Sequence, residues 1–416
     1  MAGRARPSGT GVPDLVSVMA WDVDTLKLDR VRTMMADEDL DAIVARTPDN
    51  ILYLTNYWCM KGYDAVVFPR EGEPTLLALE PQMDDAQRTS WTRDIRPFAN
   101  YDPKDPRPPM DRALDGCLAV LKERGLGRRV GLELSQGVQA MDRMVGEPTV
   151  FSQPFFDAFR AGPGEVVDAS GLLARARMIK TDQELERMRL ANELATLALE
   201  HVRERLVPGM RCSEVGAMFE GFVHATGIGY KGKVEMARAF TLVWSGPGIR
   251  TFTATGDRPV CEHEPTLLEI WVCADGYWTD LTKNFCPGEL TPRYNTLLEL
   301  LLGIYDEAVA FATDGAEIGE IDKLIRARIA EGGYPGQPSH PVAHGVGARA
   351  HEPPFAHQAA AGKMATNMVF AIEPGAYWEE GGGLRLEDDY LITGGKAERL
   401  GTFRDDFRED LRRTGC

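Results

Sequence analysis

Five residues in the last third of the chain have side chains suited to metal-assisted chemistry: Glu269, Asp280, His344, Glu373 and Glu387. Each lies in a short apolar segment, where a lone charge would cost several kcal/mol to bury without a partner. Divalent cations prefer oxygen ligands, with an occasional imidazole. Four carboxylates and one histidine therefore suit a site in which two cations activate water for hydrolysis.

The first two acids lie on the arms of a predicted β-hairpin, LEIWVCADGYWTDLTKNF, whose Asp275–Gly276 pair is typical of a tight turn. A turn centred between Ala274 and Asp275 would place Glu269 directly opposite Asp280. A centre shifted by one residue would make the two acids diagonal neighbours on one face, about 5–8 Å apart at their side-chain roots. They would then repel unless a cation, a proton or a basic partner lay between them. For the hairpin alone, a solvated face with unrelated acids is the alternative.

Three histidines follow within SHPVAHGVGARAHEPP: His340, His344 and His351. One buried histidine is usually a core residue with satisfied hydrogen bonds. Three in a glycine-rich, non-helical segment, where the backbone can approach a ligand, favour a functional role.

Two glutamates lie in predicted strands, Glu373 in FAIEPGAYW and Glu387 in GGGLRLEDDY. Glutamate is a poor strand residue, so both positions favour a site. The structural alternative pairs Glu387 with Arg385 or leaves both in solvent. The neighbouring Asp388 and Asp389 are predicted to be solvated.

Composition excludes several classes of protein. The chain of 416 residues has 47 Lys and Arg against 63 Asp and Glu, a net charge of −16, which argues against nucleic acid and anionic membranes as partners. It contains no apolar run long enough to cross a bilayer. Seven scattered cysteines without a CxxC pair indicate thiols in a reducing cytoplasm. Residues 1–20 are expected to form a disordered tail, not a signal peptide.

Helical and strand patterns alternate over the first half of the chain and predict an α/β domain over residues 21–174. A long helix follows, with Thr181 or Asp182 as its N-cap. Strand patterns separated by glycine-rich turns then dominate, with two further helices between them. Residues 175–416 are therefore expected to form a second domain.

Together these segments resemble the pita-bread metallohydrolase family, which includes aminopeptidase P, prolidase, methionine aminopeptidase and the metal-free creatinase. LDAIVARTPDNILYLTNY is similar to the creatinase-type N-terminal domain, and ARARMIKTDQELERMRLAN to the entry into the catalytic domain. The order of acidic hairpin, histidine cluster, I-E-P-G and R-x-E also matches the family. The resemblance implies an α/β (α+β) chain whose pita-bread catalytic domain contains a curved antiparallel sheet.

The resemblance also implies roles for individual residues. Asp280 and Glu387 match bridging ligands, His344 the single histidine ligand, and Glu373 the ligand that activates water. His340 and His351 match histidines that position substrate and stabilise or shuttle charge, and Arg385 is a further candidate substrate-binding residue. The implied cofactor is two divalent cations (manganese, iron, cobalt or zinc).

Two major departures from the family pattern stand out. Glu269 stands where the first ligand is an aspartate, which shifts the cluster or changes its coordination. The histidine that precedes the acidic hairpin in the family is absent; Thr251 and Thr253 lie near its place, and a hydroxyl cannot carry protons as imidazole does near neutral pH. A milder change is Lys283, where arginine is common.

The expected function is metal-dependent hydrolysis of a peptide, amide or amidine C–N bond, similar to Xaa-Pro peptidases but with an altered active site. One alternative is a metal-free hydrolase of a small nitrogenous compound, resembling creatinase or ectoine hydrolase, and a second is a metal-dependent lyase resembling dimethylsulfoniopropionate lyase. A non-catalytic binding module is disfavoured by the histidines. The resemblance further implies a homodimer that acts on a small molecule or short peptide, and the cysteine pattern indicates a cytoplasmic location. The sequence leaves open which substrate and which metal the protein uses.

Overall fold

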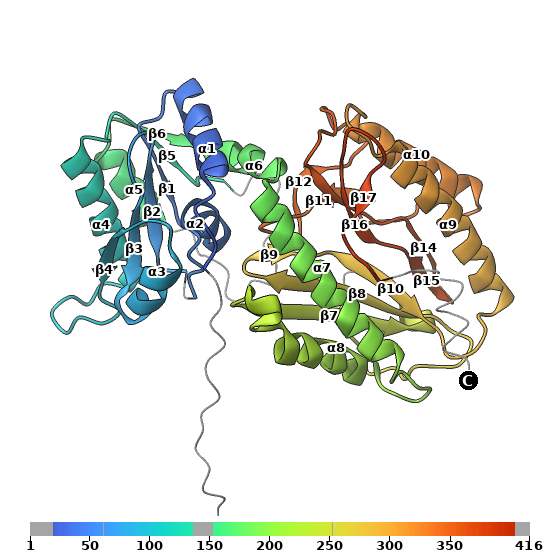
Figure 1. Ribbon diagram of the computed structural model, residues 1–416. Coiled ribbons are helices and arrows are strands. Elements are labelled where there is room, and N and C mark those ends of the chain that lie inside the picture. The colour runs from blue at the N-terminus through green and yellow to red at the C-terminus, as the bar shows by residue number, and fades with distance from the viewer. Residues whose placement is uncertain (1–19, 61, 136–152, 252, 404–416) are drawn as a thin grey trace, which may run out of the picture.

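The computed structural model describes residues 20–60, 62–135, 153–251 and 253–403. Apart from Ala20, the expected tail at residues 1–20 lies outside these ranges. Within them, no helix combines the length and apolar character that crossing a membrane requires. The structure has an N-terminal α/β half and a C-terminal half rich in antiparallel strands, which begins with a long helix (Figure 1).

The N-terminal half is built on a six-stranded sheet in the order β4-β3-β2-β1-β5-β6. Its strands are β1 (Ala42–Ala45), β2 (Ala65–Pro69), β3 (Thr75–Leu79), β4 (Asp94–Phe98), β5 (Arg129–Leu132) and β6 (Glu165–Asp168). β1 pairs in parallel with β5 and antiparallel with β2, so the sheet is mixed. The α/β prediction for this half is confirmed.

Helices cover both faces of this sheet, and successive strand residues contact opposite layers. Ile43 packs with α1 (Thr25–Asp37), α2 (Pro48–Thr55) and α6 (Ser170–Met178), whereas Val44 packs with α4 (Pro109–Arg124) and α5 (Gln153–Ala161). The short α3 (Met83–Thr89) precedes β4. The expected division between residues 174 and 175 falls inside α6 and stays a prediction.

The long helix α7 (Asp182–Arg203) begins with a capping box. The Thr181 hydroxyl accepts from the backbone N–H of Glu184, and the Glu184 carboxylate accepts from that of Thr181. α7 and α8 (Cys212–Gly227) pack on one antiparallel sheet, whose strands are β7 (Ala237–Ser245), β8 (Thr266–Ala274), β9 (Tyr277–Trp278) and β10 (Leu281–Phe285). The predicted N-cap at Thr181 is confirmed.

A second antiparallel sheet completes the C-terminal half. It has the order β12-β11-β13-β16-β17, with β11 (Ala343–Gly345), β12 (Glu352–Phe355), β13 (Val369–Ile372), β16 (Asp388–Leu391) and β17 (Glu398–Arg399). A hairpin of β14 (Gly375–Trp378) and β15 (Gly382–Arg385) lies beside it, and α9 (Pro292–Phe311) and α10 (Ile318–Glu331) pack against this region. An isolated bridge between Thr282 and Glu387 links the two sheets, bringing the predicted ligands of both together.

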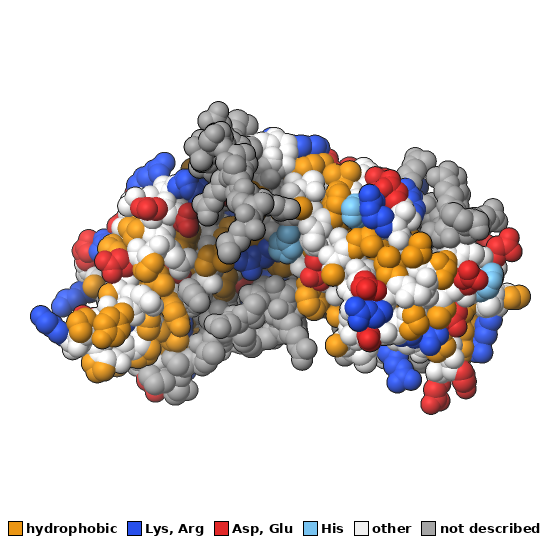
Figure 2. Space-filling view, turned by 90° about the horizontal axis from the view of Figure 1, so that it is seen from below, with side chains coloured by type: hydrophobic (Ala, Val, Ile, Leu, Met, Phe, Trp, Pro, Cys, Tyr) orange, Lys and Arg blue, Asp and Glu red, His pale blue; other side chains and the backbone are white. Residues whose placement is uncertain are grey.

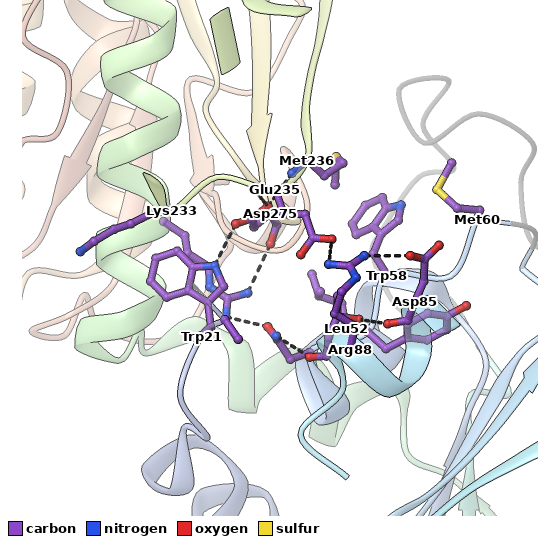
Figure 3. Close-up of a pocket in the computed structure, with 15 residues that line it drawn as sticks. Trp21, Leu52, Trp58, Met60, Asp85, Arg88, Lys233, Glu235, Met236 and Asp275 are labelled. Carbon is purple, nitrogen blue, oxygen red and sulfur yellow. Dashed lines mark hydrogen bonds and ion pairs between the residues drawn. The ribbon is translucent and has the colours of Figure 1, made fainter. Parts of the chain in front are cut away.

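The two halves meet along a seam of charged, aromatic and aliphatic side chains (Figure 3). A cavity of about 370 Å³ lies there, at the tip of the β8–β9 hairpin. Arg88 of α3 pairs with Asp85 and, across the seam, with Glu235, while the Trp21 indole N–H donates to Asp275 at 2.8 Å. Because these charges pair with one another, they are not available to bind a charged ligand in the cavity.

Charged side chains are dispersed on the face of the molecule shown in Figure 2. Lys and Arg alternate there with Asp and Glu among apolar side chains, and no extended area of one sign is visible among the described residues. This face therefore lacks the basic surface on which nucleic-acid binding depends.

Candidate metal centre

The β8–β9 turn sets the register that brings the first acids together. Asp275 and Gly276 form the two-residue turn with positive φ angles of 46° and 84°, as the Asp-Gly pair predicted. Thr282 lies directly opposite Glu269, so Asp280 is the diagonal neighbour of Glu269 on the same face. The register shifted by one residue is thus confirmed, and the directly opposed arrangement is wrong.

Four of the predicted ligands converge on one buried point: Asp280 and His344 from the two sheets, Glu373 at the end of β13, and Glu387 before β16. His344 Nε2 lies 3.5 Å from both Asp280 Oδ2 and Glu373 Oε1. His344, Glu373 and Glu387 offer ligand atoms within 4.8 Å of one another, as do Asp280, His344 and His351. All four ligands are at most 6% exposed.

Hydrogen bonding leaves ligand atoms free at this point. His344 Nδ1 is 3.0 Å from the Gly345 carbonyl oxygen, so Nδ1 carries the proton and Nε2 a lone pair directed at the acids. Neither His344 Nε2 nor Asp280 Oδ2 makes a hydrogen bond of good geometry among the described residues, although His351 Nε2 lies 3.2 Å from Asp280 Oδ2. Two such acceptors buried among carboxylates suit a divalent cation, and this donor set of oxygen and imidazole nitrogen fits one.

Burial dominates the protonation of the cluster. It raises the pKa of Glu373 and Glu387 to about 8, and the pKa of Asp280 well above its ordinary value, with neighbouring carboxylates adding to the effect for Asp280 and Glu387. Burial also lowers the pKa of His340 and His344 to about 3, so both imidazoles are neutral at pH 7. These carboxyl groups cannot all be ionised at once unless their negative charges are neutralised. Bound cations can neutralise them, or some of the groups keep their protons.

Glu269 has a different partner. Its Oε2 lies 2.7 Å from Arg385 Nη2, and neither group of ligand atoms includes it. Arg385 is buried; its Nε donates to the Thr282 hydroxyl at 2.8 Å and lies 3.7 Å from Glu387 Oε2. The structure therefore places the predicted ligand Glu269 and the predicted substrate residue Arg385 together at the edge of the cluster.

The two histidines that were not predicted to bind metal, His340 and His351, flank the acids. His340 Nδ1 lies 3.1 Å from Glu373 Oε2, and its Nε2 is 3.0 Å from the Tyr377 hydroxyl. His351, with a side chain 39% exposed, has Nε2 3.2 Å from Asp280 Oδ2. His351 is accessible enough to touch a substrate, whereas His340 is buried.

Comparison with known families and proteins identifies the family to which this chain belongs. Residues 186–394 match the model of metallopeptidase family M24, and residues 27–179 match the creatinase/prolidase N-terminal domain. The chain belongs to metallopeptidase family M24. Membership confirms the predicted family and fold class and makes the chain a hydrolase.

Individual relatives agree with M24 membership. The chain is similar to a predicted dipeptidase of Bacillus subtilis, 25% identical over 375 residues, which cover 88% of this chain and 95% of the relative. A Xaa-Pro dipeptidase of Pyrococcus furiosus is 30% identical over 225 residues, 54% of this chain and 63% of the relative. The solved structure of the Pyrococcus horikoshii prolidase has 22% identity and a TM-score of 0.75, covering 92% of this chain and 99% of its own. That structural likeness supports the fold.

Within this M24 site, sequence reasoning missed Thr282, Tyr377 and the stacked pair Phe240–Trp271. Thr282 donates to Glu387 Oε2 at 2.6 Å, and its alternation with Asp280 could have identified it. Phe240 and Trp271 face each other across β7 and β8, with ring centroids 5.5 Å apart, and Trp271 lies 6.1 Å from the His351 ring. This aromatic pair gives the cluster an apolar neighbour, which no short sequence motif predicts.

The prediction that Asp388 and Asp389 are solvated is wrong. Both are buried. Asp388 pairs with Lys283 at 2.8 Å and accepts from the Tyr305 hydroxyl, while Asp389 accepts from Asn192 at 3.1 Å. The partners lie far away in the chain, which is why local sequence patterns assigned these acids to solvent.

The position near the absent histidine is occupied by a hydroxyl with other partners. Thr253 Oγ1 accepts from the Trp244 indole N–H at 3.0 Å and donates to the Arg250 carbonyl at 2.9 Å. Thr253 thus stabilises its own loop and provides no proton carrier.

Proposed function

We propose that the chain is a metal-dependent hydrolase of a C–N bond, with two divalent cations held by Asp280, His344, Glu373 and Glu387. The observation that supports it most strongly is the convergence of ligand atoms from these four buried residues on one point, where the pKa of the carboxylates is raised. Glu269 would join as the remaining ligand, sharing its charge with Arg385. Bound cations would supply an acidified water and polarise the scissile carbonyl.

The chain's own residues have distinct roles in this proposal. Glu373 would take the proton of the attacking water, with His340 beside its second oxygen. His351, the more exposed histidine, would contact the substrate near the reacting carbonyl, and Arg385 would act through Glu269. The Phe240–Trp271 pair next to His351 favours substrates with an apolar group.

Xaa-Pro dipeptides are the first substrates to test, since two of the relatives are named as Xaa-Pro dipeptidases. Because the upstream histidine is absent, we expect the substrate specificity to differ from that of Xaa-Pro dipeptidases. The test therefore includes other dipeptides, amides and amidines. A homodimer and a cytoplasmic location also belong to the proposal; sedimentation at twice the 45.9 kDa of one chain would support the dimer.

A metal-free hydrolase is the second candidate, and the Glu269–Arg385 pair favours it. A guanidinium 2.7 Å from Glu269 offsets the negative charge of that residue without a cation. Creatine-like and ectoine-like compounds therefore belong in the substrate panel.

The deciding experiment incubates the protein with each substrate, with added Mn²⁺ or with a chelator, and identifies products by mass spectrometry. The proposal expects hydrolysis that requires metal and that falls at least about a hundredfold in Glu373→Gln. Turnover that survives chelation would favour the metal-free candidate. Elimination products without added water would indicate a lyase and contradict the proposal.

A further inference from the structure

The loop that carries His351 is anchored on both sides by ion pairs. Two residues before His351, Arg349 makes a bidentate pair with Asp49, with Nε 2.6 Å from Oδ2 and Nη2 3.0 Å from Oδ1. One residue after it, Glu352 Oε1 lies 2.8 Å from Lys180 Nζ. Asp49 belongs to α2, so the N-terminal half holds one side of this loop.

These ion pairs form a network of alternating charges across the junction of the two halves. Arg177 links them, because its Nη1 lies 2.5 Å from Asp49 Oδ2 and its Nε 3.2 Å from Glu352 Oε2. Asp49, Arg177, Glu352 and Lys180 are each at most 5% exposed. Burial alone would raise the pKa of Asp49, but Arg349 and Arg177 bring it below its ordinary value, so Asp49 is ionised at pH 7.

The loop itself is packed without spare room. A Cβ on Gly347 would lie 2.4 Å from Glu352 Oε1 and 2.9 Å from Lys180 Cε. The Gly347 carbonyl accepts from the backbone N–H of Trp278 at 2.9 Å, which ties the loop to the acidic hairpin. His351, between these anchors, has its Nε2 3.2 Å from Asp280 Oδ2.

Stability alone does not account for the Asp49–Arg349 pair. Apolar residues of similar volume often replace a buried ion pair without loss of stability. A bidentate carboxylate–guanidinium pair, in contrast, fixes distance and orientation. That property is useful where a catalytic loop must be held to within a fraction of an ångström.

We propose that Asp49 is a positioning residue of the candidate active site: by fixing Arg349, it sets where His351 stands relative to Asp280. The role of His351 in turnover rests on the proposed function, whereas its placement by Asp49 does not. The site is complete when α2 of the N-terminal half is docked against the His351 loop.

The test compares three variants with the unaltered protein. Asp49→Asn and Arg349→Gln break the same pair from either side, so a folding failure of one leaves the other to decide. The control is Arg88→Gln, which removes a different ion pair between the halves, that with Glu235 at the cavity of Figure 3. The first readout is the side-chain ¹⁵N resonances of labelled histidines, with those of His351 assigned by their loss in His351→Gln.

We expect the His351 resonances to shift or broaden in Asp49→Asn and Arg349→Gln and to stay unchanged in Arg88→Gln. If both pair-breaking variants leave them unchanged, the proposal is wrong, whether or not the protein hydrolyses anything.

Kinetics provide the second readout. We expect kcat to fall about tenfold in Asp49→Asn, with KM altered less than about threefold. The double variant Asp49→Asn/His351→Gln should be no slower than His351→Gln alone, because both act through one group. Full additivity of the two losses would overturn the proposal. Absence of any turnover in the unaltered protein would contradict the proposed function and leave the resonance comparison to decide the role of Asp49.

Discussion

The negative charges of the buried carboxylates in the candidate metal centre can be neutralised by protons as well as by cations, and this competition has a measurable consequence. Burial raises the pKa of Glu373 and Glu387 to about 8, against about 4.3 for an exposed glutamate. In metal-depleted protein the folded state thus binds more protons than the unfolded state between about pH 4.3 and 8. Its free energy of unfolding should fall as pH rises through that window.

Cation affinity should change in the opposite direction. Because binding displaces these protons, we expect the affinity for Mn²⁺ to rise at least about tenfold between pH 6 and 7 and to level off near pH 8. Titration calorimetry at several pH values, in buffers of different ionisation enthalpy, measures both the affinity and the protons released. An affinity independent of pH, with no proton release, would contradict this protonation scheme.

Thr282 contacts both Arg385 and the candidate ligand Glu387. It donates to Glu387 Oε2 at 2.6 Å and accepts from Arg385 Nε at 2.8 Å, so Thr282→Val removes the group that orients both. We predict about tenfold weaker Mn²⁺ binding, as is typical when the support of a ligand is lost. Thr266→Val is the matched control: Thr266 is also buried in this sheet, but its hydroxyl pairs with Ser245. Equal affinities in the two variants would show that Thr282 has no such role.

Residue types made part of this centre predictable. Carboxylates in apolar strands and a histidine among glycines indicated Asp280, His344, Glu373 and Glu387, which the structure brings together. The partners of these residues were not predictable in the same way. Arg385 binds Glu269 from 116 positions away, and Asp388 depends on Lys283 and Tyr305, contacts that local sequence does not encode.

Among the elements, the β8–β9 hairpin matters most, because it positions Glu269 and Asp280. Gly276 at its tip has a φ of 84°, and a Cβ there would lie 1.9 Å from Leu52 Cδ2 of α2. Local residue patterns predicted the turn and the shared face of the acids, and left two registers open. The contact with α2, which could not be anticipated from the hairpin, makes this glycine part of the seam between the halves.

Gly276→Ala should therefore lower the free energy of unfolding by more than the backbone strain at this position alone would. Gly209 has a similar φ of 87°, and a Cβ added there would meet nothing within 4 Å, so Gly209→Ala measures the strain alone, about 1–2 kcal/mol. We expect Gly276→Ala to lose about 1–3 kcal/mol more through overpacking against Leu52. Urea unfolding of both variants gives the difference. Equal losses would mean that the hairpin tip and α2 do not pack as described.

For the molecule as a whole, alternating helix and strand patterns predicted the α/β half, and strands between glycine-rich turns predicted the antiparallel half. The contacts that join the halves could not be predicted. Asp49 and Arg349, 300 residues apart, each look like an ordinary surface charge in the sequence, yet they form a bidentate pair beside the candidate active site. Such pairs become visible only when both elements are placed in space.

The central claim is that this fold holds two divalent cations between its antiparallel sheets, and metal content tests it most directly. Protein purified without added metal, then equilibrated with Mn²⁺ and desalted, would be analysed by mass spectrometry together with Asp280→Asn. We predict about two equivalents per chain in the unaltered protein and a sharp fall in the variant. A folded protein that retains no metal at any pH up to about 8 would contradict the claim and transfer the chemistry to Glu269 and the histidines.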